Sequence, residues 1–435
     1  MCHTKRMHSS LSTEELAAWI RLTLEPGLGP AQARTLLAAI GLPQDIYAMS
    51  TSSLAKFLPH DLAHQLHLPP AADIESAIAR TLEWLAAPNH YLLTLADPAY
   101  PQTLLDSHDP PLLLYVNGNL EYLARPMIAI VGARNATPAG TDNAKAFAQY
   151  LAEHDWCIVS GLAQGIDAAA HQGALRAGPE GGGTVAILGT GIDIVYPAKN
   201  RELAHLIAQH GALVSEFPLG MRALPHQFPK RNRIVAGLSR GVLVVEAATQ
   251  SGSLITAKLA SDTGREVFAI PGSIHSPLSR GCHALIRQGA KLVESGQDIH
   301  DELGLPRLDF AKPPVPSYSP RHRAETKEAT PATSATTATA RSTAGSASTS
   351  SKILPRRSAL VQDDSETETP VERGTPATNV TRHETLLAAL GYDPVHLDTL
   401  QTRTQLDLGT LNSQLLELEL NELVARLDDG RFQRR

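Results

Sequence analysis

Met127-Ile-Ala-Ile-Val-Gly132-Ala-Arg134 is the stretch that decides the fold. Its apolar residues predict a buried parallel strand, Met127–Val131, and the following glycine predicts a tight turn. In a Rossmann-type sheet such a turn opens the first crossover, where phosphates bind backbone N–H groups at a helix N-terminus. A dinucleotide-binding turn has the pattern G-x-G-x-x-G, but Arg134 replaces the second glycine here. A guanidinium at this point indicates phosphate recognition by a charged fork rather than close backbone approach to a pyrophosphate.

Residues 127–303 alternate between predicted strands and helices, which indicates an α/β fold with a mostly parallel sheet covered on both faces. We therefore expect an extended Rossmann-like domain over 91–303, including a connecting arm at its start. The expected strands are Leu92–Leu95, Leu112–Val116, Met127–Val131, Cys157–Ser160, Thr184–Leu188, Leu213–Glu216, Gly241–Glu246, Val267–Ile270 and Lys291–Val293.

Three further segments flank this domain. Residues 12–80 predict a small helical domain, in which Glu25-Pro-Gly-Leu-Gly-Pro-Ala-Gln-Ala-Arg34 resembles a helix-hairpin-helix or sterile-alpha-motif-like (SAM-like) unit. Such a hairpin either contacts DNA phosphates through helix N-termini or is a turn in a packing domain, and a single copy favours neither. Residues 304–380 are of low complexity, which predicts a disordered linker. Residues 381–435 show helical periodicity and end in Gly430-Arg-Phe432, which predicts a small winged helix.

The composition narrows the class of protein. The formal net charge of −6 means that any nucleic-acid site must be a local basic patch on an acidic chain. There is no run of 18 apolar residues and no apolar signal core near Met1, so we expect neither a transmembrane helix nor a secretory signal. Cys2, Cys157 and Cys282 are far apart, and the histidines lack ligand spacing. We therefore expect a reduced, cytoplasmic protein with no metal and no cofactor.

Polar residues follow the strands at the edge of the sheet where open α/β folds bind ligands. Five cations from three separated loops, if they converge, form a pocket for several phosphates; the alternatives are solvated surface charge and ion pairs with Glu216 or Glu246. Glycines allow close backbone approach, hydroxyl and amide groups offer hydrogen bonds, and Phe228 offers a stacking face or else a core side chain. The predicted phosphate-binding residues are Gly132, Arg134, Ser160, Gly161, Gly165, Gly189, Lys199, Asn200, Phe228, Lys230, Arg231, Asn232, Arg233, Ser251 and Gly252.

Catalytic interpretations find less support. Asp167 and His171 lie four residues apart on a predicted helix, and a structural role is favoured over a catalytic pair or half of a metal site. No nucleophile elbow, Ser-His-Asp order or third metal ligand accompanies them. One alternative stays open, a phosphoribohydrolase-like nucleotide-processing enzyme with Glu246 as the acid or base, although the P-G-G-x-G-T-x-x-E block of those enzymes is absent. A purely structural scaffold is a third alternative, but it leaves the cations unexplained.

These blocks together resemble the DNA-processing protein A family, also called DprA or Smf, over about 92–300. The matching blocks are Val131-Gly-Ala-Arg134, Ser160-Gly-Leu-Ala-Gln-Gly-Ile-Asp-Ala-Ala-Ala-His171, Tyr196-Pro-Ala-Lys-Asn200, Ser215-Glu-Phe-Pro218, Phe228-Pro-Lys-Arg-Asn-Arg233, Glu246-Ala-Ala-Thr-Gln-Ser-Gly-Ser253 and Gly281-Cys-His-Ala-Leu-Ile-Arg-Gln-Gly-Ala-Lys291. The terminal segments also resemble the family's sterile-alpha-motif-like and winged-helix domains. Ala133 departs from the family, because serine is common at that position.

The resemblance implies a protein without catalytic activity that binds and protects single-stranded DNA. It further implies loading of the RecA recombinase during natural transformation, and a homodimer with His283 and Leu292 near the contact. Arg134, Lys199, Arg231 and Arg233 are the cations that the resemblance assigns to DNA. The winged helix has six arginines against nine acidic residues, so we favour a partner-contact or regulatory role for it over DNA docking.

Overall fold

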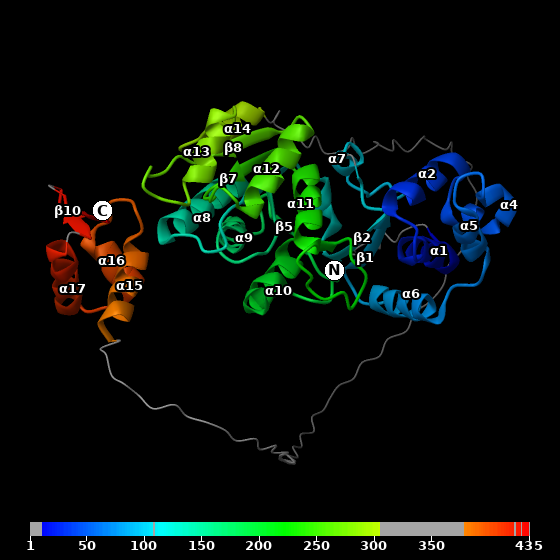
Figure 1. Ribbon diagram of the computed structural model, residues 1–435, viewed down its shortest axis with the longest axis horizontal. Coiled ribbons are helices and arrows are strands. Elements are labelled where there is room, and N and C mark those ends of the chain that lie inside the picture. Colours follow the sequence, from blue (N-terminus) through cyan, green and yellow to red (C-terminus); the bar gives the residue numbers. More distant parts are fainter. Residues whose placement is uncertain (1–10, 108, 305–377, 422, 428, 435) are drawn as a thin grey trace, which may run out of the picture. The chain divides into compact units, whose positions relative to one another are not determined.

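The computed structural model describes residues 11–304 and 378–434, apart from residues 108, 422 and 428. Within these ranges lie N-terminal helices, a central α/β domain and a C-terminal unit of helices and a β-hairpin (Figure 1). The predicted linker over 304–380 lies outside the described residues except at its ends, so its disorder stays a prediction.

The central domain is built on a nine-stranded sheet with the order β1-β2-β6-β5-β4-β3-β7-β8-β9. The strands from β6 to β9 in that order are parallel, while β1 and β2 are antiparallel additions at one end. The mostly parallel α/β fold is thereby confirmed. The strands are β1 (His90–Thr94), β2 (Leu113–Gly118), β3 (Met127–Val131), β4 (Cys157–Ser160), β5 (Thr184–Ile187), β6 (Ala212–Ser215), β7 (Gly241–Val244), β8 (Glu266–Ala269) and β9 (Lys291–Leu292).

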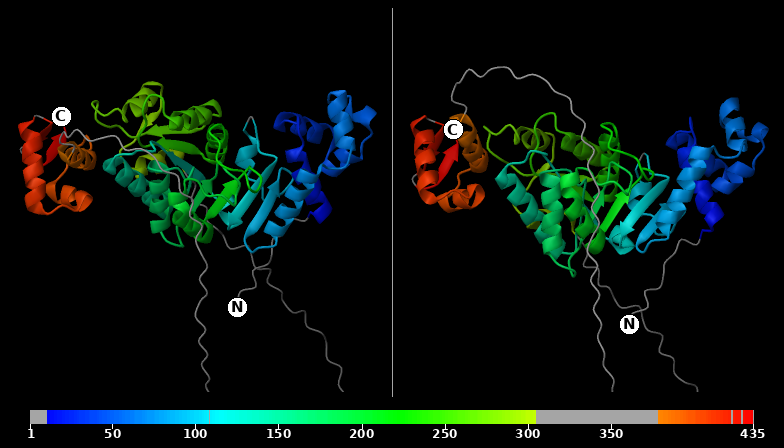
Figure 2. Two further views of the ribbon diagram at one scale, coloured as in Figure 1. Left: turned by 60° about the horizontal axis from the view of Figure 1, so that its bottom comes forward. Right: turned by 90° about the horizontal axis from the view of Figure 1, so that it is seen from below.

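Both faces of this sheet are buried, as the continuous apolar strands predict. Along β3, Met127 and Ala129 belong to one hydrophobic cluster, and Ile128 and Ile130 belong to a second. Because successive side chains of a strand point to opposite faces, these two clusters lie on opposite sides of the sheet. Helices accordingly lie on both sides of the strands (Figure 2).

Seven longer helices and three short ones complete the described part of the domain. Their connections put the carboxyl ends of the parallel strands, and the loops that follow them, at one edge of the sheet. The helices are α7 (Gln102–Leu105), η1 (Leu120–Ala124), α8 (Pro138–Glu153), α9 (Ile166–Arg176), η2 (Ala198–Asn200), α10 (Arg201–His210), α11 (Gln227–Leu238), α12 (Gly252–Asp262), α13 (Arg280–Arg287) and α14 (Gly296–Leu303).

The strand order reverses beside β3. The chain adds β4, β5 and β6 on one side of β3 and then returns with β7 on the other side. In open α/β sheets ligands bind at such a switch point, outside the carboxyl ends of the two strands. The loops after β3 and β7 are therefore the first places to look for a ligand.

The N-terminal helices share a core with the antiparallel end of the sheet. Trp19 and Ile20 of α1 are buried in one cluster with Leu92 and Tyr115 of β1 and β2. The residues after Ser12 form a helix because Ser12 and Glu15 make a capping box at its start. The helices are α1 (Thr13–Leu24), α2 (Pro30–Ile40), α3 (Pro43–Ala48), α4 (Thr51–Leu54), α5 (His60–His67) and α6 (Ala72–Leu85).

The C-terminal unit has the three helices and the β-hairpin of a winged helix, which agrees with the predicted fold. Its core includes Leu386, Leu400, Leu415 and Phe432. The elements are α15 (Thr378–Leu390), α16 (Leu397–Thr404), α17 (Leu408–Leu420), β10 (Val424–Arg426) and β11 (Phe432–Arg434). Over the described residues of the whole chain, no helix is long and apolar enough to span a membrane.

Candidate nucleic-acid interface

The loop after β3 presents Arg134 to solvent. Arg134 is exposed and forms no hydrogen bond or ion pair with another described residue. Its loop packs closely against the start of α9, because a Cβ atom at Gly165 would lie 2.3 Å from the Ala133 carbonyl oxygen. A Cβ atom at Gly132 would lie 2.6 Å from Ile166. These two glycines thus serve the packing of the loop that carries Arg134, which is a different use from close approach to a ligand.

One aromatic ring lies beside this cation, and a second ring lies beside the first. The Arg134 guanidinium carbon is 5.7 Å from the centroid of the Phe228 ring. Phe228 in turn lies 5.5 Å from the ring of Tyr196, which is 52% exposed. Gly189 makes room for Phe228, because a Cβ atom there would be 2.9 Å from the phenylalanine ring. The result is an exposed aromatic surface next to a free guanidinium, a combination that suits stacked bases and their phosphates.

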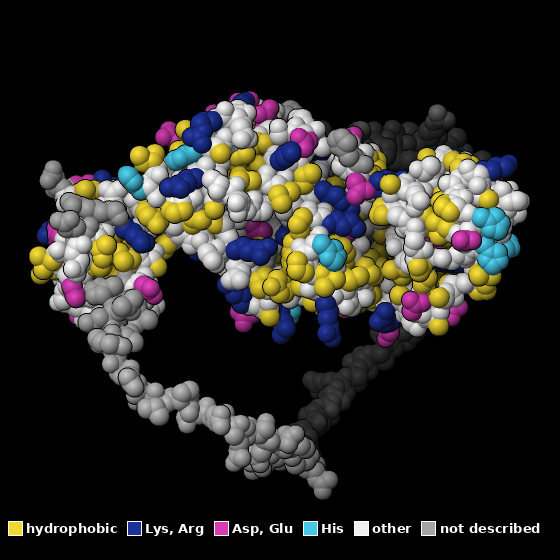
Figure 3. Space-filling view, viewed as in Figure 1, with side chains coloured by type: hydrophobic (Ala, Val, Ile, Leu, Met, Phe, Trp, Pro, Cys, Tyr) yellow, Lys and Arg dark blue, Asp and Glu magenta, His cyan; other side chains and the backbone are white. Residues whose placement is uncertain are grey.

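Two lysines add positive charge on the segments that carry these rings. Lys199 is exposed in η2 and has no ion-pair partner among the described residues. Lys230 is exposed on α11, and its ammonium is 3.8 Å from the Glu216 carboxylate. Lysine and arginine side chains gather on the surface over α10 and α11 (Figure 3). The basic patch that an acidic chain would need is therefore present on this face.

Arg233 does not belong to that exposed patch. It forms ion pairs with the Glu216 carboxylate and with Asp109, and it also donates a hydrogen bond of 2.6 Å to the Asp109 carbonyl oxygen. Asp109 binds Arg34 of α2 as well, at 2.5 Å. Burial raises the pKa of Glu216, and the charges of Arg233 and Lys230 oppose that rise. Arg233 is therefore an ion-pair residue, as one of the alternatives expected. Its pairing with Glu216 was among those predicted, whereas its pairing with Asp109 was not.

Arg231 is buried, with only 4% of its surface exposed. Its guanidinium donates a hydrogen bond of 2.9 Å to the Ile187 carbonyl oxygen and fills the space above Gly161, where a Cβ atom would collide with it. Asp167 is the nearby carboxylate that stabilises its charge. The expectation that all five cations face a ligand is therefore corrected. Arg231 is buried beneath the loop after β4, and the charge of Arg233 is neutralised by Glu216 and Asp109.

A sequence signal for the burial of Arg231 was available. Arg231 precedes Ile234, Val235 and Leu238 by three, four and seven residues, and all four are buried on α11. This spacing is the apolar stripe of a helix that faces a core. A cation at its first position is therefore expected to lie inside.

The Ser160 hydroxyl and the Asn200 amide, which were predicted to contact a ligand, are buried instead. Ser160 is fully buried and donates to the Ile130 carbonyl oxygen at 2.6 Å, so its hydroxyl is not available to a ligand. Asn200 is buried and donates to Leu162 and Ala163, which fastens the loop after β4. These side chains shape the loops, because their donors already have backbone partners.

The residues at the start of α12 have structural partners too. Ser251 caps this helix by accepting from the backbone N–H of Ser253. Asn232 approaches the Gly252 carbonyl oxygen at 3.4 Å. A Cβ atom at Gly252 would meet no neighbour, so a ligand contact at this glycine stays a prediction.

Asp167 and His171 both have structural partners, as the favoured interpretation expects. Asp167 accepts hydrogen bonds from the backbone N–H groups of Gly161 and Ala163, which lie in the loop before α9. His171 lies 2.7 Å from the Thr184 hydroxyl, and burial lowers its pKa to about 3. A neutral, buried imidazole with this partner has no access to a substrate.

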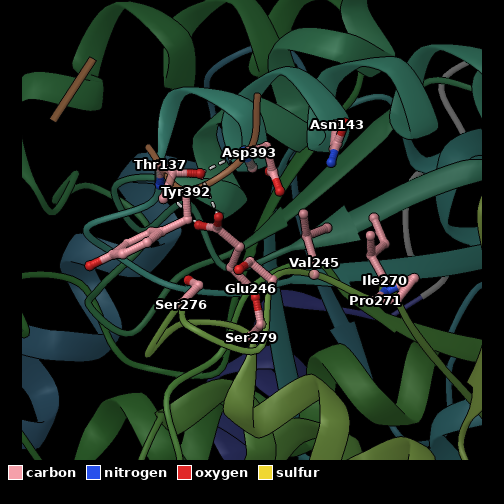
Figure 4. Close-up of a pocket in the computed structure, with 13 residues that line it drawn as sticks. Thr137, Asn143, Val245, Glu246, Ile270, Pro271, Ser276, Ser279, Tyr392 and Asp393 are labelled. Carbon is pink, nitrogen blue, oxygen red and sulfur yellow. Dashed lines mark hydrogen bonds between the residues drawn. The ribbon is translucent and has the colours of Figure 1, made fainter. Parts of the chain in front are cut away.

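Glu246 lies at the switch point and is held by the start of α8 (Figure 4). Its carboxylate accepts a hydrogen bond of 2.9 Å from the Thr137 backbone N–H and one of 2.5 Å from the Thr137 hydroxyl. Burial raises the pKa of Glu246, and the two bonds from Thr137 oppose the rise. Glu246, the acid or base of the enzymatic alternative, thus bonds the segment after β7 to the start of α8.

The two residues assigned to a dimer contact lie near the far end of the sheet. Leu292 is 50% exposed at the end of β9, and the His283 imidazole lies 3.1 Å from the Gly272 carbonyl oxygen. Their role in self-association stays a prediction. Among the described residues, no group of three or more His, Cys, Asp or Glu is arranged to hold a metal ion.

The fold and this edge define a class: an extended Rossmann-like protein with a winged helix, which has the Glu246 carboxylate at its switch point and a basic, aromatic edge beside it. Family models give the class a name. The model described as DNA recombination-mediator protein A matches residues 91–304, and the model described as DprA winged helix domain matches residues 371–430. The chain belongs to this family of DNA-processing proteins, as the motifs had indicated.

Individual relatives agree with this assignment. DNA processing protein DprA of Streptococcus pneumoniae is 48% identical over 206 residues, which cover 47% of this chain and 72% of that protein. Protein Smf of a Synechocystis species is 31% identical over 437 residues, covering 98% of this chain and all of the relative. The X-ray structure of the Streptococcus pneumoniae protein superposes with a TM-score of 0.57 at 35% identity, covering 68% of this chain and 99% of that one.

Proposed function

We propose that this chain binds single-stranded DNA at the carboxyl edge of the sheet without cleaving it. The observation that carries the proposal is the free guanidinium of Arg134, 5.7 Å from the Phe228 ring, with the exposed Tyr196 ring beside it. Unpaired bases expose π-faces that stack on aromatic side chains, while cations bind the backbone phosphates. Lys199 and Lys230, which follow Tyr196 and Phe228 by three and two residues, add exposed positive charge.

The absence of catalysis is part of the same proposal. Each acidic or imidazole side chain considered for catalysis already has a partner: Glu246 of the enzymatic alternative binds Thr137, and in the Asp167–His171 pair Asp167 binds two backbone N–H groups and His171 binds Thr184. None of the three is free to move a proton to a bound nucleotide. We therefore prefer a binding protein to a phosphoribohydrolase-like enzyme.

The biological setting that we propose follows from family membership. We infer that the bound strand is protected and passed to the RecA recombinase during natural transformation, in the cytoplasm and by a homodimer in which Leu292 is near the contact. The half-exposed Leu292 at the end of the sheet is consistent with an apolar contact between two copies.

The test is binding of a fluorescently labelled 20-residue oligothymidylate, measured by anisotropy with unlabelled duplex DNA as competitor. Arg134→Gln should raise Kd about tenfold, because it removes a charge-assisted contact to phosphate. The matched control is Arg176→Gln, which removes an exposed cation from the last turn of α9, at the opposite edge of the sheet. Equal binding by wild type and Arg134→Gln, or preference for the duplex, would contradict the proposal.

A further inference from the structure

Glu246 occupies the place where Rossmann proteins hold a phosphate. It follows β7 at the switch point, and its carboxylate accepts both the backbone N–H and the hydroxyl of Thr137, the residue that caps α8. An anion at a helix N-terminus is stabilised by the unpaired N–H groups and by the helix dipole. In this chain the anion is a side chain of the protein itself.

The start of α8 packs closely against this carboxylate. Gly140 lies in the first turn of α8, and a Cβ atom there would be 2.3 Å from the Glu246 carboxyl carbon. The Thr137 hydroxyl also accepts the Gly140 backbone N–H at 2.9 Å, so Glu246, Thr137 and Gly140 form one connected set. The start of α8 is therefore fixed to the end of β7.

This attachment determines the course of the loop that carries Arg134. The loop begins at Gly132, is fastened at Ala133 by a hydrogen bond of 3.2 Å from the Ile166 N–H, and is fastened again at Thr137 by Glu246. Arg134 lies between the two attachment points, and its side chain has no hydrogen-bond or ion-pair partner among the described residues. Its position over Phe228 thus depends on the backbone at both ends of the loop.

We propose that Glu246 is a positioning residue for DNA binding, which holds the loop so that Arg134 meets the DNA from beside the Phe228 ring. This inference rests on the proposed function. It makes a prediction opposite in sign to simple electrostatics. Removing a negative charge near a DNA site should tighten binding, whereas releasing the loop should weaken it.

The experiment measures oligothymidylate binding by anisotropy and thermal unfolding for Glu246→Ala, Glu246→Gln, Arg134→Gln and the double variant Glu246→Ala/Arg134→Gln. Glutamine keeps the shape and an acceptor for the Thr137 N–H, so Glu246→Gln should bind DNA at least as tightly as wild type. Alanine removes both bonds, so Glu246→Ala should raise Kd about threefold or more. In the Arg134→Gln background the same change should have no further effect, because Glu246 acts through Arg134.

A matched control is Asp298→Ala. Asp298 caps α14 by accepting the backbone N–H groups of Glu294 and Ser295, and it has no link to the Arg134 loop. It should lose stability without losing affinity for DNA. Should Glu246→Ala fail to fold, Thr137→Val removes only the hydroxyl bonds, and a smaller, equally non-additive loss is expected.

The outcomes separate the two proposals. If Arg134→Gln binds DNA like wild type, the DNA site itself is misplaced. If Arg134→Gln weakens binding but Glu246→Ala adds its full effect on top, or tightens binding, the positioning role is wrong. Loss of binding in Glu246→Gln with unchanged unfolding would also overturn it, because that variant keeps the side-chain shape and the bond from the Thr137 N–H.

Discussion

Helix α11 and the loop after β3 bring cations to the same edge of the sheet and put them to different uses. On α11, Arg231 is buried under the loop after β4, and Arg233 is paired with Glu216 and Asp109. In the loop after β3, Arg134 has no acidic partner and lies beside an aromatic ring. A cation in a matching motif is thus free to contact DNA only where the interior offers it no acceptor.

The largest effect that separates the two regions is expected at Arg231. Arg231→Met should lower the free energy of unfolding by about 3 kcal/mol, because Asp167 would keep a buried charge without its cation. Urea denaturation measures this. The control is the neighbouring Lys230→Met, which should change stability by no more than about 0.5 kcal/mol. Equal losses for the two variants would mean that Arg231 is not buried as described.

A second test measures how the unfolding free energy depends on pH through the buried His171. The pKa of His171 is lowered to about 3 in the folded chain, from an ordinary value of 6.5. Between these values the unfolded chain binds the extra proton, so stability is full above 6.5 and is lost as pH falls toward 3. The unfolding free energy should drop by about 2 kcal/mol between pH 7 and pH 5 from this group alone.

His171→Gln should flatten that part of the pH profile, measured by urea denaturation at several pH values. The slope is the readout, because the substitution also alters packing. A profile as steep as that of wild type would show that the imidazole titrates normally or that other groups dominate this range.

A third variant tests the Phe228 ring beside Arg134. Phe228→Leu keeps an apolar side chain but removes the stacking face, and it should raise Kd for oligothymidylate about tenfold. The dependence of affinity on salt should stay the same, because no charge is removed. A changed salt slope with an unchanged Kd at low salt would indicate that the ring is a core residue whose loss disturbs the cations.

The smallest expected effects are at Lys199 and Lys230. Lys199→Gln should raise Kd about threefold, since lysine is a single, well-hydrated point charge. Lys230→Gln should have still less effect, because the nearby Glu216 already offsets its charge. The same anisotropy assay ranks both, and a larger loss for Lys230 than for Lys199 would reverse the assignment of free and paired cations.

The sequence predicted the sheet well, because buried parallel strands are continuous apolar runs. Strand β3 has the predicted ends, and the strands after it differ from prediction by at most two residues at either end. The winged helix was also recognisable from its periodicity. The sequence left the role of the helical hairpin open. Arg34, the last residue of its motif, forms an ion pair with Asp109 in the connecting arm. That pairing joins residues far apart in the chain, so no local pattern shows it.

The sequence predicted where the site lies, but not which of its side chains face a ligand. Glycines and cations after each strand indicated the correct edge, because parallel strands bring their carboxyl ends together. Whether Ser160 or Arg231 faces outward depends on backbone acceptors such as Ile130 and Ile187 in neighbouring strands, which motifs do not contain. The helical spacing around Arg231 was the one local signal of its burial.

The salt dependence of oligothymidylate binding tests the central claim most directly. With the three exposed cations Arg134, Lys199 and Lys230 on the phosphates, the slope of log K against log salt should be near −2, and it should fall to about −0.7 in Arg134→Gln/Lys199→Gln. The unfolding temperature should be the same for both proteins. An unchanged slope in the folded double variant would contradict the account, because the strand would then be bound by other charges.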